Sequence, residues 1–346
     1  MVDKLHYITK IEISKLWGEF DIEWNLDSDV NILSGANGSG KSTVLDCACA
    51  LLYSGMIPKD IATLDKIKIT FNNHKFIFFE RGVIEDTIKN IEIKAKDSVM
   101  YKEMLTYLKD KTGKKFNAIK SFKAETFVSS LDNTSLDPNQ ITESELESLN
   151  LDTISTFDTA IIDTKAVKKI SDDKVRTELD LEIFNLQKEY LNYQLNLSRR
   201  KDQLVNESSN IKEDIINLNK PHQLFLEIID NLFKKTGKSI DRDKNEISFL
   251  LNKKEINVCQ LSSGEKQLII ILLTVLLQDN KNSILFMDEP EISLHIDWQK
   301  YLLEYMVKLN PNVQIITATH SPGLVMNGWV DKVNEMSDII MHKNKG

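Results

Sequence analysis

The 346-residue sequence has little cysteine, no long hydrophobic run and no excess of basic residues. Its three cysteines, Cys47, Cys49 and Cys259, lack the number and spacing of a disulfide framework. No histidine or second cysteine pair accompanies Cys47 and Cys49, so we interpret them as packed, reduced thiols, which favours a cytoplasmic protein. The longest apolar run, residues 268–277, is about half the length that spans a bilayer. It therefore predicts a buried helix and no membrane association.

Charge is unevenly distributed along the chain. The 44 basic residues are outnumbered by 52 acidic ones, which argues against a generally basic surface. Residues 101–123 hold seven lysines among four aromatic residues, a composition that suits a nucleic-acid backbone. We favour a solvated face for this stretch and leave DNA open as a partner. Residues 124–164 have no lysine or arginine, and Pro138 with many Ser, Thr and Asn residues predicts loop in parts of this stretch.

Both ends of the chain show the patterns of an α/β fold. Near the N-terminus, residues 11–26 predict two strands, residues 30–33 a buried strand, residues 41–53 a helix and residues 67–79 a hairpin. After residue 260, helices at 265–277 and 297–309 alternate with strands at 283–287 and 313–317. This alternation is typical of a mainly parallel sheet.

The middle of the chain predicts helix. Apolar residues recur every seven positions over residues 179–218, strongly in the first half and weakly in the second. A bend is expected at residues 206–210. The pattern fits a compact helical lid, or short coiled coil, and it fits equally well an amphipathic helix that packs on its own domain.

A glycine-rich segment carries the first chemical motif. Residues 35–42, Gly-Ala-Asn-Gly-Ser-Gly-Lys-Ser, fit the phosphate-binding P-loop and lie between a predicted buried strand and a helix. The glycines let backbone N–H groups surround phosphates, Lys41 is expected at the β- and γ-phosphates, and Ser42 at Mg²⁺. The predicted nucleotide-binding residues of this segment are Gly35, Asn37, Gly38, Ser39, Gly40, Lys41, Ser42 and Thr43.

Two acids follow the apolar strand at residues 283–287. Asp288 is expected to hold Mg²⁺ through water, and Glu289 to act as the general base that polarises the attacking water. An apolar strand followed by Asp-Glu is common by itself. The assignment therefore depends on the order of the motifs around it.

Residues 261–267, Leu-Ser-Ser-Gly-Glu-Lys-Gln, resemble the signature of ABC-type ATPases. In that family the signature faces the γ-phosphate of a nucleotide held by another subunit. The resemblance implies a head-to-tail dimer around two ATP molecules, with Ser262, Ser263, Gly264 and Glu265 at the nucleotide, and with few signature hydrogen bonds inside one subunit. Ser262 and Glu265 also fit a helix capping box, and both interpretations can hold.

His320, after the last predicted strand, resembles the ABC switch histidine that senses the γ-phosphate. Residues 288–295, Asp-Glu-Pro-Glu-Ile-Ser-Leu-His, are similar to the corresponding segment of RecF, OLD and SMC-like ATPases, which makes His295 a candidate dimer contact. The resemblance covers residues 11–53 and 259–338. Candidates for the remaining ABC positions are Asp158 or Gln140 for the glutamine loop, and Trp17 or Phe20 for adenine stacking or core packing.

The motifs together predict an ABC-type P-loop ATPase head with a mixed or parallel sheet, an N-terminal antiparallel portion and a helical insertion. We expect an N-terminal lobe at 1–100, an insertion at 101–225 and a C-terminal lobe at 226–346. The resemblance implies an ATP- and Mg²⁺-dependent switch, working as a homodimer or larger assembly. It suggests an anti-phage defence ATPase, as in PARIS, Septu-like or retron-linked systems, controlling a nuclease or toxin from the same operon. A RecF-like DNA repair ATPase is the alternative, and a transporter subunit is a weaker one.

Overall fold

The computed structural model of the protein describes residues 4–55, 57, 61–81, 139–154, 175, 177–207 and 210–341. The lysine-rich stretch 101–123 and Asp158 lie outside these residues. The chain divides into two compact units, each described by itself. Unit 1 comprises Met1–Ser28, Asn37–Leu149 and Asn334–Gly346, and unit 2 comprises Asp29–Ala36 and Asn150–Val333. The division into 1–100, 101–225 and 226–346 stays a prediction.

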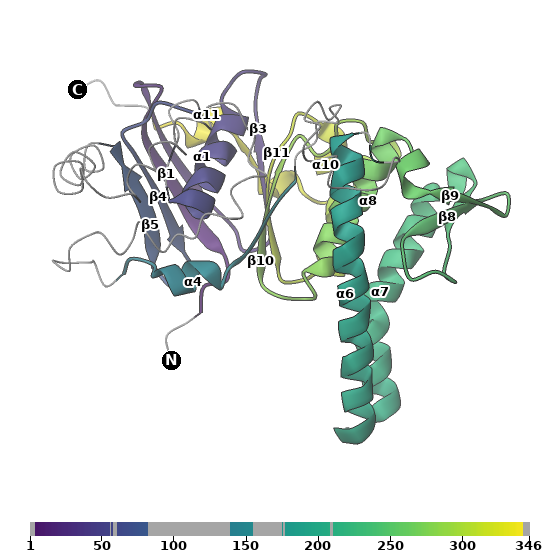
Figure 1. The fold of residues 1–346 in the computed structure, drawn as a ribbon. Coiled ribbons are helices and arrows are strands. Elements are labelled where there is room, and N and C mark those ends of the chain that lie inside the picture. Colours follow the sequence, from purple (N-terminus) through teal and green to yellow (C-terminus); the bar gives the residue numbers. More distant parts are fainter. Residues whose placement is uncertain are drawn as a thin grey trace, which may run out of the picture. The chain divides into compact units, whose positions relative to one another are not determined.

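Unit 1 is built on an antiparallel sheet (Figure 1). In sheet order its strands are β2 (Phe20–Asn25), β1 (Ile8–Leu16), β4 (Lys66–Phe71) and β5 (Phe76–Glu80). Alternate residues of β4 are fully buried, which is the pattern of a strand with one face on the core. Helix α1 (Lys41–Ser54) packs against β4 and β5. The predicted N-terminal strands, the helix and the 67–79 hairpin are therefore confirmed.

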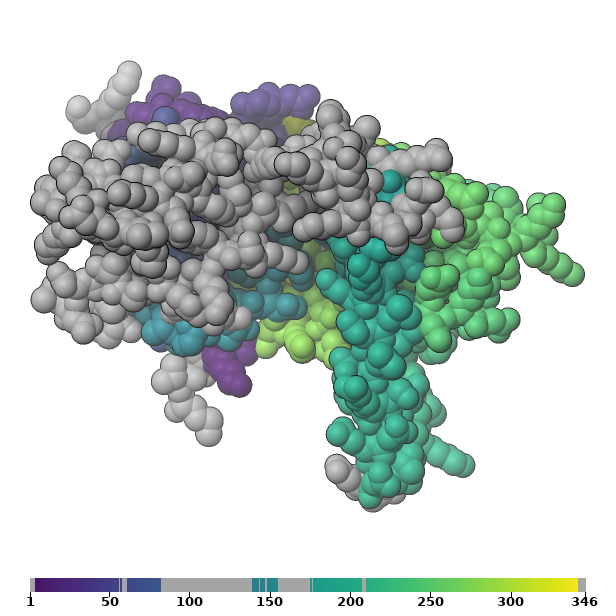
Figure 2. Space-filling model, in the orientation of Figure 1, coloured from purple at the N-terminus to yellow at the C-terminus, as the bar shows by residue number. Residues whose placement is uncertain are grey.

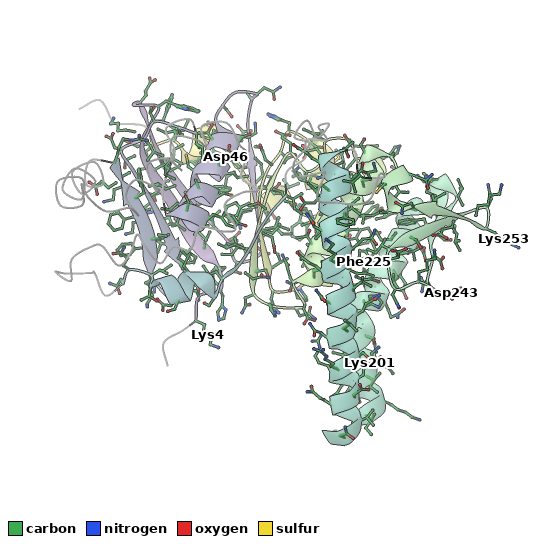
Figure 3. All side chains as sticks on the ribbon, viewed as in Figure 1. Lys4, Asp46, Lys201, Phe225, Asp243 and Lys253 are labelled. Atoms are coloured by element: carbon green, nitrogen blue, oxygen red, sulfur yellow. The ribbon has the colours of Figure 1, made fainter. Side chains whose placement is uncertain are left out.

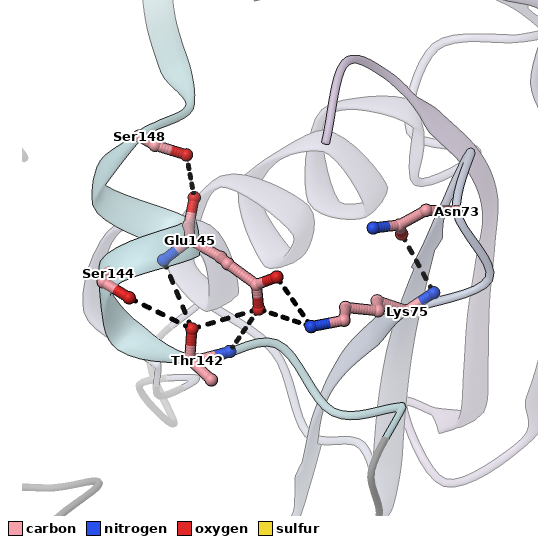
Figure 4. A network of polar contacts seen from close by, with 6 residues as sticks. All are labelled: Asn73, Lys75, Thr142, Ser144, Glu145 and Ser148. Atoms are coloured by element: carbon pink, nitrogen blue, oxygen red, sulfur yellow. Dashed lines mark hydrogen bonds and ion pairs between the residues drawn. The ribbon is translucent and has the colours of Figure 1, made fainter. Parts of the chain in front are cut away.

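The short helix α4 (Glu143–Glu147) is fastened to the β4–β5 hairpin through one carboxylate (Figure 4). Glu145 lies 2.6 and 2.8 Å from Lys75 Nζ, and it accepts hydrogen bonds from the backbone N–H and the hydroxyl of Thr142, both at 3.0 Å. The described part of the stretch without basic residues thus forms regular structure beside its loops. Helix α11 (Met336–Ile339) packs next to β2.

Unit 2 contains a parallel sheet (Figure 1). Its strands are, in order, β3 (Val30–Ser34), β11 (Val313–Ala318), β10 (Ser283–Asp288) and β6 (Asn150–Ile154). Strand β12 (Val333–Glu335), whose first residue ends the unit, follows β3 at the edge. The predicted parallel sheet is confirmed. Because its strands run the same way, their carboxyl ends meet at one edge, where ligands bind in such sheets.

Helix α8 (Ser263–Leu277) is buried among α6 (Glu178–Glu207), α7 (Ile211–Phe233) and α9 (Ile296–Leu309). Residues 268–273 of α8 are at most 1% exposed, so the predicted buried helix is confirmed. Beyond α7, a three-stranded antiparallel sheet is formed by β7 (Lys238–Ile240), β8 (Ser248–Leu251) and β9 (Lys254–Asn257). Asp243 and Lys253 mark its two turns in Figure 3.

Helices α6 and α7 lie on either side of the predicted bend and pack against each other, so the chain direction reverses between them. The α6 residues on the seven-residue repeat lie in the core of unit 2 as far as Leu197, so this part of the helix packs on its own domain. The residues concerned are Leu179, Ile183, Leu186, Tyr190, Tyr193 and Leu197. Toward the reversal the pair leaves the rest of unit 2 (Figures 2 and 3), and Val205 is 55% exposed.

No helix within the described residues is long and apolar enough to cross a membrane.

Candidate functional site

The two predicted acids, Asp288 and Glu289, lie at the carboxyl edge of the unit 2 sheet. Strand β10 ends at Asp288, and Glu289 follows with a left-handed φ of 50°. The Glu289 N–H still donates to Ala318 O of β11 at 2.8 Å, so the turn stays attached to the neighbouring strand. Asp288 and Glu289 are both half-buried at this edge.

His320, two residues past the end of β11, faces Glu289. Its Nε2 atom lies 3.0 Å from Glu289 Oε1, and its backbone N–H donates to Glu289 Oε2 at 3.3 Å. An imidazole at hydrogen-bonding distance holds a carboxylate in one orientation. The structure thus pairs the predicted general base with the predicted switch histidine.

The second acid of the Glu-Pro-Glu segment, Glu291, has a role that sequence reasoning missed. It is only 8% exposed, and its Oε1 atom accepts hydrogen bonds from the Thr319 hydroxyl and from the backbone N–H groups of His320 and Ser321. Its position two residues after Glu289 was the only sequence signal. A buried carboxylate needs donors nearby, and here they all come from the loop that carries the histidine.

The predicted signature residues form the N-terminus of α8. The Ser262 hydroxyl accepts from the Glu265 N–H at 3.3 Å, and Glu265 Oε2 accepts from the Ser262 N–H at 3.0 Å, so the capping box is present. Ser262 is therefore hydrogen-bonded within its own chain, whereas the signature predicted few such bonds there. Within the described residues the half-buried Ser263 hydroxyl makes no hydrogen bond. Gly264 is buried against Ser293, in the segment after Glu289.

Two buried ion pairs hold this helix start in place. Glu265 lies 2.7 Å from Lys238 of β7, and Lys266 lies 2.7 Å from Asp180 of α6. Burial by itself raises the pKa of Glu265, but the bonds from Lys238 and Ser262 outweigh it and leave the pKa below its ordinary value. Glu265 was expected at the nucleotide, whereas its carboxylate is engaged with Ser262 and Lys238.

The P-loop begins at Gly35 and Ala36 in unit 2 and continues into unit 1 from Asn37. Gly38 and Gly40 have left-handed φ values of 77° and 103°, and α1 starts at Lys41 directly after Gly40. Lys41 is 4% exposed, whereas Ser42 is exposed at the start of the helix. Thr43 is half-buried behind them.

These residues fit a nucleotide phosphate and its metal. The Ser39 hydroxyl oxygen is buried and has no hydrogen-bond partner among the described residues. A bound phosphate oxygen could accept the hydrogen bond that this hydroxyl can donate. The exposed Ser42 hydroxyl is a hard oxygen ligand, the type that Mg²⁺ prefers. When bound, Mg²⁺ neutralises charge on the phosphate oxygens. Phosphates suit the N–H groups at the start of α1.

Trp17 stands beside the P-loop in unit 1. The ring lies so close to Gly40 that a Cβ on Gly40 would meet Trp17 Cη2 at 2.5 Å, and 42% of the residue is exposed. Phe20 packs edge-on to Trp17, with the ring centroids 6.2 Å apart. Of the two aromatic candidates, Trp17 is therefore the one that borders the P-loop directly.

The remaining candidates lie elsewhere. His295 caps α9, where its Nδ1 accepts from the Asp297 N–H at 3.2 Å, and its side chain is exposed. Gln140 bridges Phe76 at the edge of β5 in unit 1. Strand β6 ends at Ile154, four residues before Asp158, which lies outside the described residues.

Two sequence families match the chain. Residues 9–59 match a family described as "P-loop containing region of AAA domain". Residues 156–327 match one described as "AAA domain, putative AbiEii toxin, Type IV TA system". The two matches cover the P-loop and the signature, carboxylate and histidine motifs respectively.

Similar proteins include two curated relatives. The "Retron Vc95 probable ATPase" of Vibrio cholerae is 32% identical over 88 residues, which is 22% of this chain and 17% of that protein. The "Retron Ec83 probable ATPase" of Escherichia coli is 33% identical over 91 residues, 23% of this chain and 16% of that protein. The matched segments thus span less than a fifth of these relatives. A solved structure, the "SmcHead bound to the C-winged helix domain of ScpA", covers 93% of this chain and 92% of its own, with a TM-score of 0.44 and 13% identity.

The α/β fold, the order of the motifs and the two family matches define a P-loop ATPase domain. Both matched families are of the AAA kind, and the likeness to ABC-type ATPases of the RecF and SMC-like group stays a prediction from the motifs.

Proposed function

We propose that this protein is a switch that binds and hydrolyses ATP and closes as a head-to-tail dimer around two ATP molecules. The observation that carries the proposal is the contact of 3.0 Å between Glu289 and His320 at the carboxyl edge of the sheet, next to Asp288. A carboxylate held by an imidazole beside a second carboxylate suits proton abstraction from water next to a metal-bound triphosphate.

In the proposed reaction Glu289 takes a proton from water, whose oxygen forms a bond to the γ-phosphorus. The bond between that phosphorus and the β,γ-bridging oxygen breaks, so ADP and phosphate leave. Lys41 offsets the negative charge on the phosphates, and Ser42 and, through water, Asp288 would hold Mg²⁺. Trp17 stacks on the adenine as an exposed aromatic ring beside the P-loop.

The dimer supplies the remaining contacts. The Ser263 hydroxyl, half-buried and without a hydrogen bond among the described residues, is proposed to reach the γ-phosphate bound by the other copy. Gly264, buried against Ser293 of its own chain, is proposed to cap the same phosphate through the start of α8. In this arrangement each copy completes the other's site, and hydrolysis reopens the pair. His295, exposed after the Glu-Pro-Glu segment, is proposed to lie at the same interface.

The biological role proposed is anti-phage defence in the cytoplasm. Support comes from the two retron ATPases and from the toxin–antitoxin wording of the matched family. The switch would control a separate effector, a nuclease or toxin encoded beside it. Co-expression with the neighbouring genes tests this: the effector should co-purify with wild type and be released or activated in an ATP-dependent way. An effector whose binding and activity ignore ATP and the Glu289→Gln change would contradict it.

ATP turnover and ATP-dependent association of Glu289→Gln test the chemistry. We expect turnover to fall by at least about a hundredfold and ATP to be retained in a stable dimer, measured by phosphate release and light scattering. Glu189→Gln, an exposed position on α6, is the matched control and should behave as wild type. The proposal is wrong if Glu289→Gln hydrolyses ATP normally, or if full turnover persists under conditions in which the protein stays monomeric.

A further inference from the structure

Glu291 is 8% exposed, and within the described residues its carboxylate accepts hydrogen bonds only from one short loop, residues 319–321. We infer that Glu291 is a positioning residue for ATP hydrolysis, which sets the switch histidine against the general base without touching the nucleotide. This inference rests on the proposed function of Glu289.

The geometry shows how the effect is transmitted. Glu291 Oε1 accepts from the His320 N–H at 3.1 Å, and the same N–H also points to Glu289 Oε2 at 3.3 Å. The backbone of His320 is thereby fixed between the two carboxylates. With the backbone fixed, the imidazole of His320 reaches Glu289 Oε1 at 3.0 Å.

The neighbouring residues support a single position for the loop. The Ser321 N–H donates to Glu291 at 3.1 Å, and the Ser321 hydroxyl lies 2.6 Å from Gln299 Oε1. Gln299 in turn donates to the Leu294 carbonyl at 2.9 Å. The loop after β11 is therefore attached to the segment after β10 through two side chains, Glu291 and Gln299.

The structure also explains why a carboxylate is needed. Three donors converge on one oxygen atom, and the other oxygen, Oε2, is buried without a hydrogen-bond partner among the described residues. An amide at this position would place an NH₂ group where no acceptor lies, or would turn it toward three donors. Either orientation loses hydrogen bonds in a buried site and lets the histidine loop move.

The main test compares ATP turnover of Glu291→Gln with wild type. Misplacing a catalytic group by about 1 Å costs roughly a hundredfold, so we expect kcat to fall by about ten- to a hundredfold. ATP affinity, measured with a fluorescent analogue, should change less than about twofold, because Glu291 holds the histidine loop and none of the P-loop. A kcat within twofold of wild type would overturn the inference.

A double-mutant cycle distinguishes positioning from general support. If Glu291 acts through His320, Glu291→Gln should lower turnover by less than about threefold in a His320→Ala background. An undiminished fall in that background would overturn the inference. Thr319→Val removes the hydroxyl donor to Glu291 and the acceptor of the Ser321 N–H but leaves the two backbone donors to Glu291, so it should lower kcat more mildly. It provides the same test if Glu291→Gln does not fold.

The variants separate the proposed function from the role of Glu291. If wild type does not hydrolyse ATP, or Glu289→Gln hydrolyses it normally, the proposed function is wrong. If wild type is active and Glu289→Gln is not, but Glu291→Gln and Thr319→Val both retain full turnover, only the role of Glu291 is wrong. Glu189→Gln on α6 again serves as the exposed control.

Discussion

Gly264, in the first turn of α8, lies directly against the carbonyl oxygen of Ser293. A Cβ atom on Gly264 would be 2.2 Å from that oxygen and 3.2 Å from the Ser293 carbonyl carbon. Both are backbone atoms, so they do not yield as a flexible side chain would. The contact joins the signature helix to the segment that begins at Glu289, and any side chain at position 264 pushes them apart.

Gly264→Ala is therefore expected to lower the free energy of unfolding by about 1–3 kcal/mol, the usual cost of overpacking, and to reduce ATP turnover. Ser263→Ala is the matched neighbour. Its hydroxyl makes no hydrogen bond within the described residues, so it should change stability by less than about 0.5 kcal/mol while still reducing turnover. Urea unfolding and phosphate release measure the two effects. If Gly264→Ala were as stable as wild type, the close contact between Gly264 and the Ser293 carbonyl would be contradicted.

Burial should determine how much each of two similar ion pairs contributes to the free energy of unfolding. Lys238–Glu265 and Lys235–Asp297 have N–O distances of 2.7 and 2.6 Å, but the lysines are 17% and 77% exposed. Lys238→Met leaves a buried carboxylate without its cation, so a loss of about 3–5 kcal/mol is expected. Lys235→Met removes a solvent-exposed pair, so its stability should stay close to that of wild type. Chemical denaturation measures both, and equal costs would show that the buried pair has no special role.

Sequence patterns predicted the elements whose signal is local. The apolar run at residues 268–277 identified a buried helix, and the alternation of β4 and β5 identified a hairpin, because burial on one face imposes a period that the sequence displays. Motif order placed Asp288, Glu289 and His320 at strand ends. These positions follow from the parallel sheet, whose carboxyl ends share one edge.

Other features depend on partners that are distant in sequence. Glu291 meets Thr319 across 28 positions and Glu265 meets Lys238 across 27, and no local pattern marks either pair. The seven-residue repeat continues from α6 into α7, although these are two separate helices. A repeat indicates which face of a helix is buried, but it does not indicate which element covers that face. The partner of each buried charge is settled only by packing.

The Lys75–Glu145 contact in Figure 4 predicts a pH dependence of stability in unit 1. The hydrogen bond from Lys75 lowers the pKa of Glu145 below its ordinary value of 4.5, although burial opposes this. Because the folded-state pKa is the lower one, the stabilisation is present above pH 4.5 and is lost as the pH falls through the folded-state value. Wild type should therefore exceed Glu145→Gln in stability at pH 7, and the difference should shrink toward pH 4.

Denaturation curves at several pH values measure this difference. Lys75→Met is the control, because without the ammonium group the Glu145→Gln change should have much the same effect at each pH. A difference between wild type and Glu145→Gln that grows as the pH falls would contradict the assigned direction.

The contact between Trp17 and Gly40 predicts how a P-loop substitution acts on ATP. Gly40 has a φ of 103°, and a Cβ there would lie 2.5 Å from Trp17 Cη2. Gly40→Ala thus adds backbone strain and a clash, and should weaken ATP binding by at least about tenfold. Trp17→Ala removes the clash but also the proposed adenine contact, so the double variant should recover part of the affinity for inorganic tripolyphosphate rather than for ATP.

Gly55, at the other end of α1, provides the matched control. Its φ is 67° and nothing lies within 4 Å of its Cβ position, so Gly55→Ala brings strain without a clash and should leave ATP binding unchanged. Trp17→Ala alone should weaken ATP binding more than binding of inorganic tripolyphosphate, since a stacked ring contacts the base and not the phosphates. Equal losses for the two ligands would show that Trp17 supports the loop and does not contact adenine.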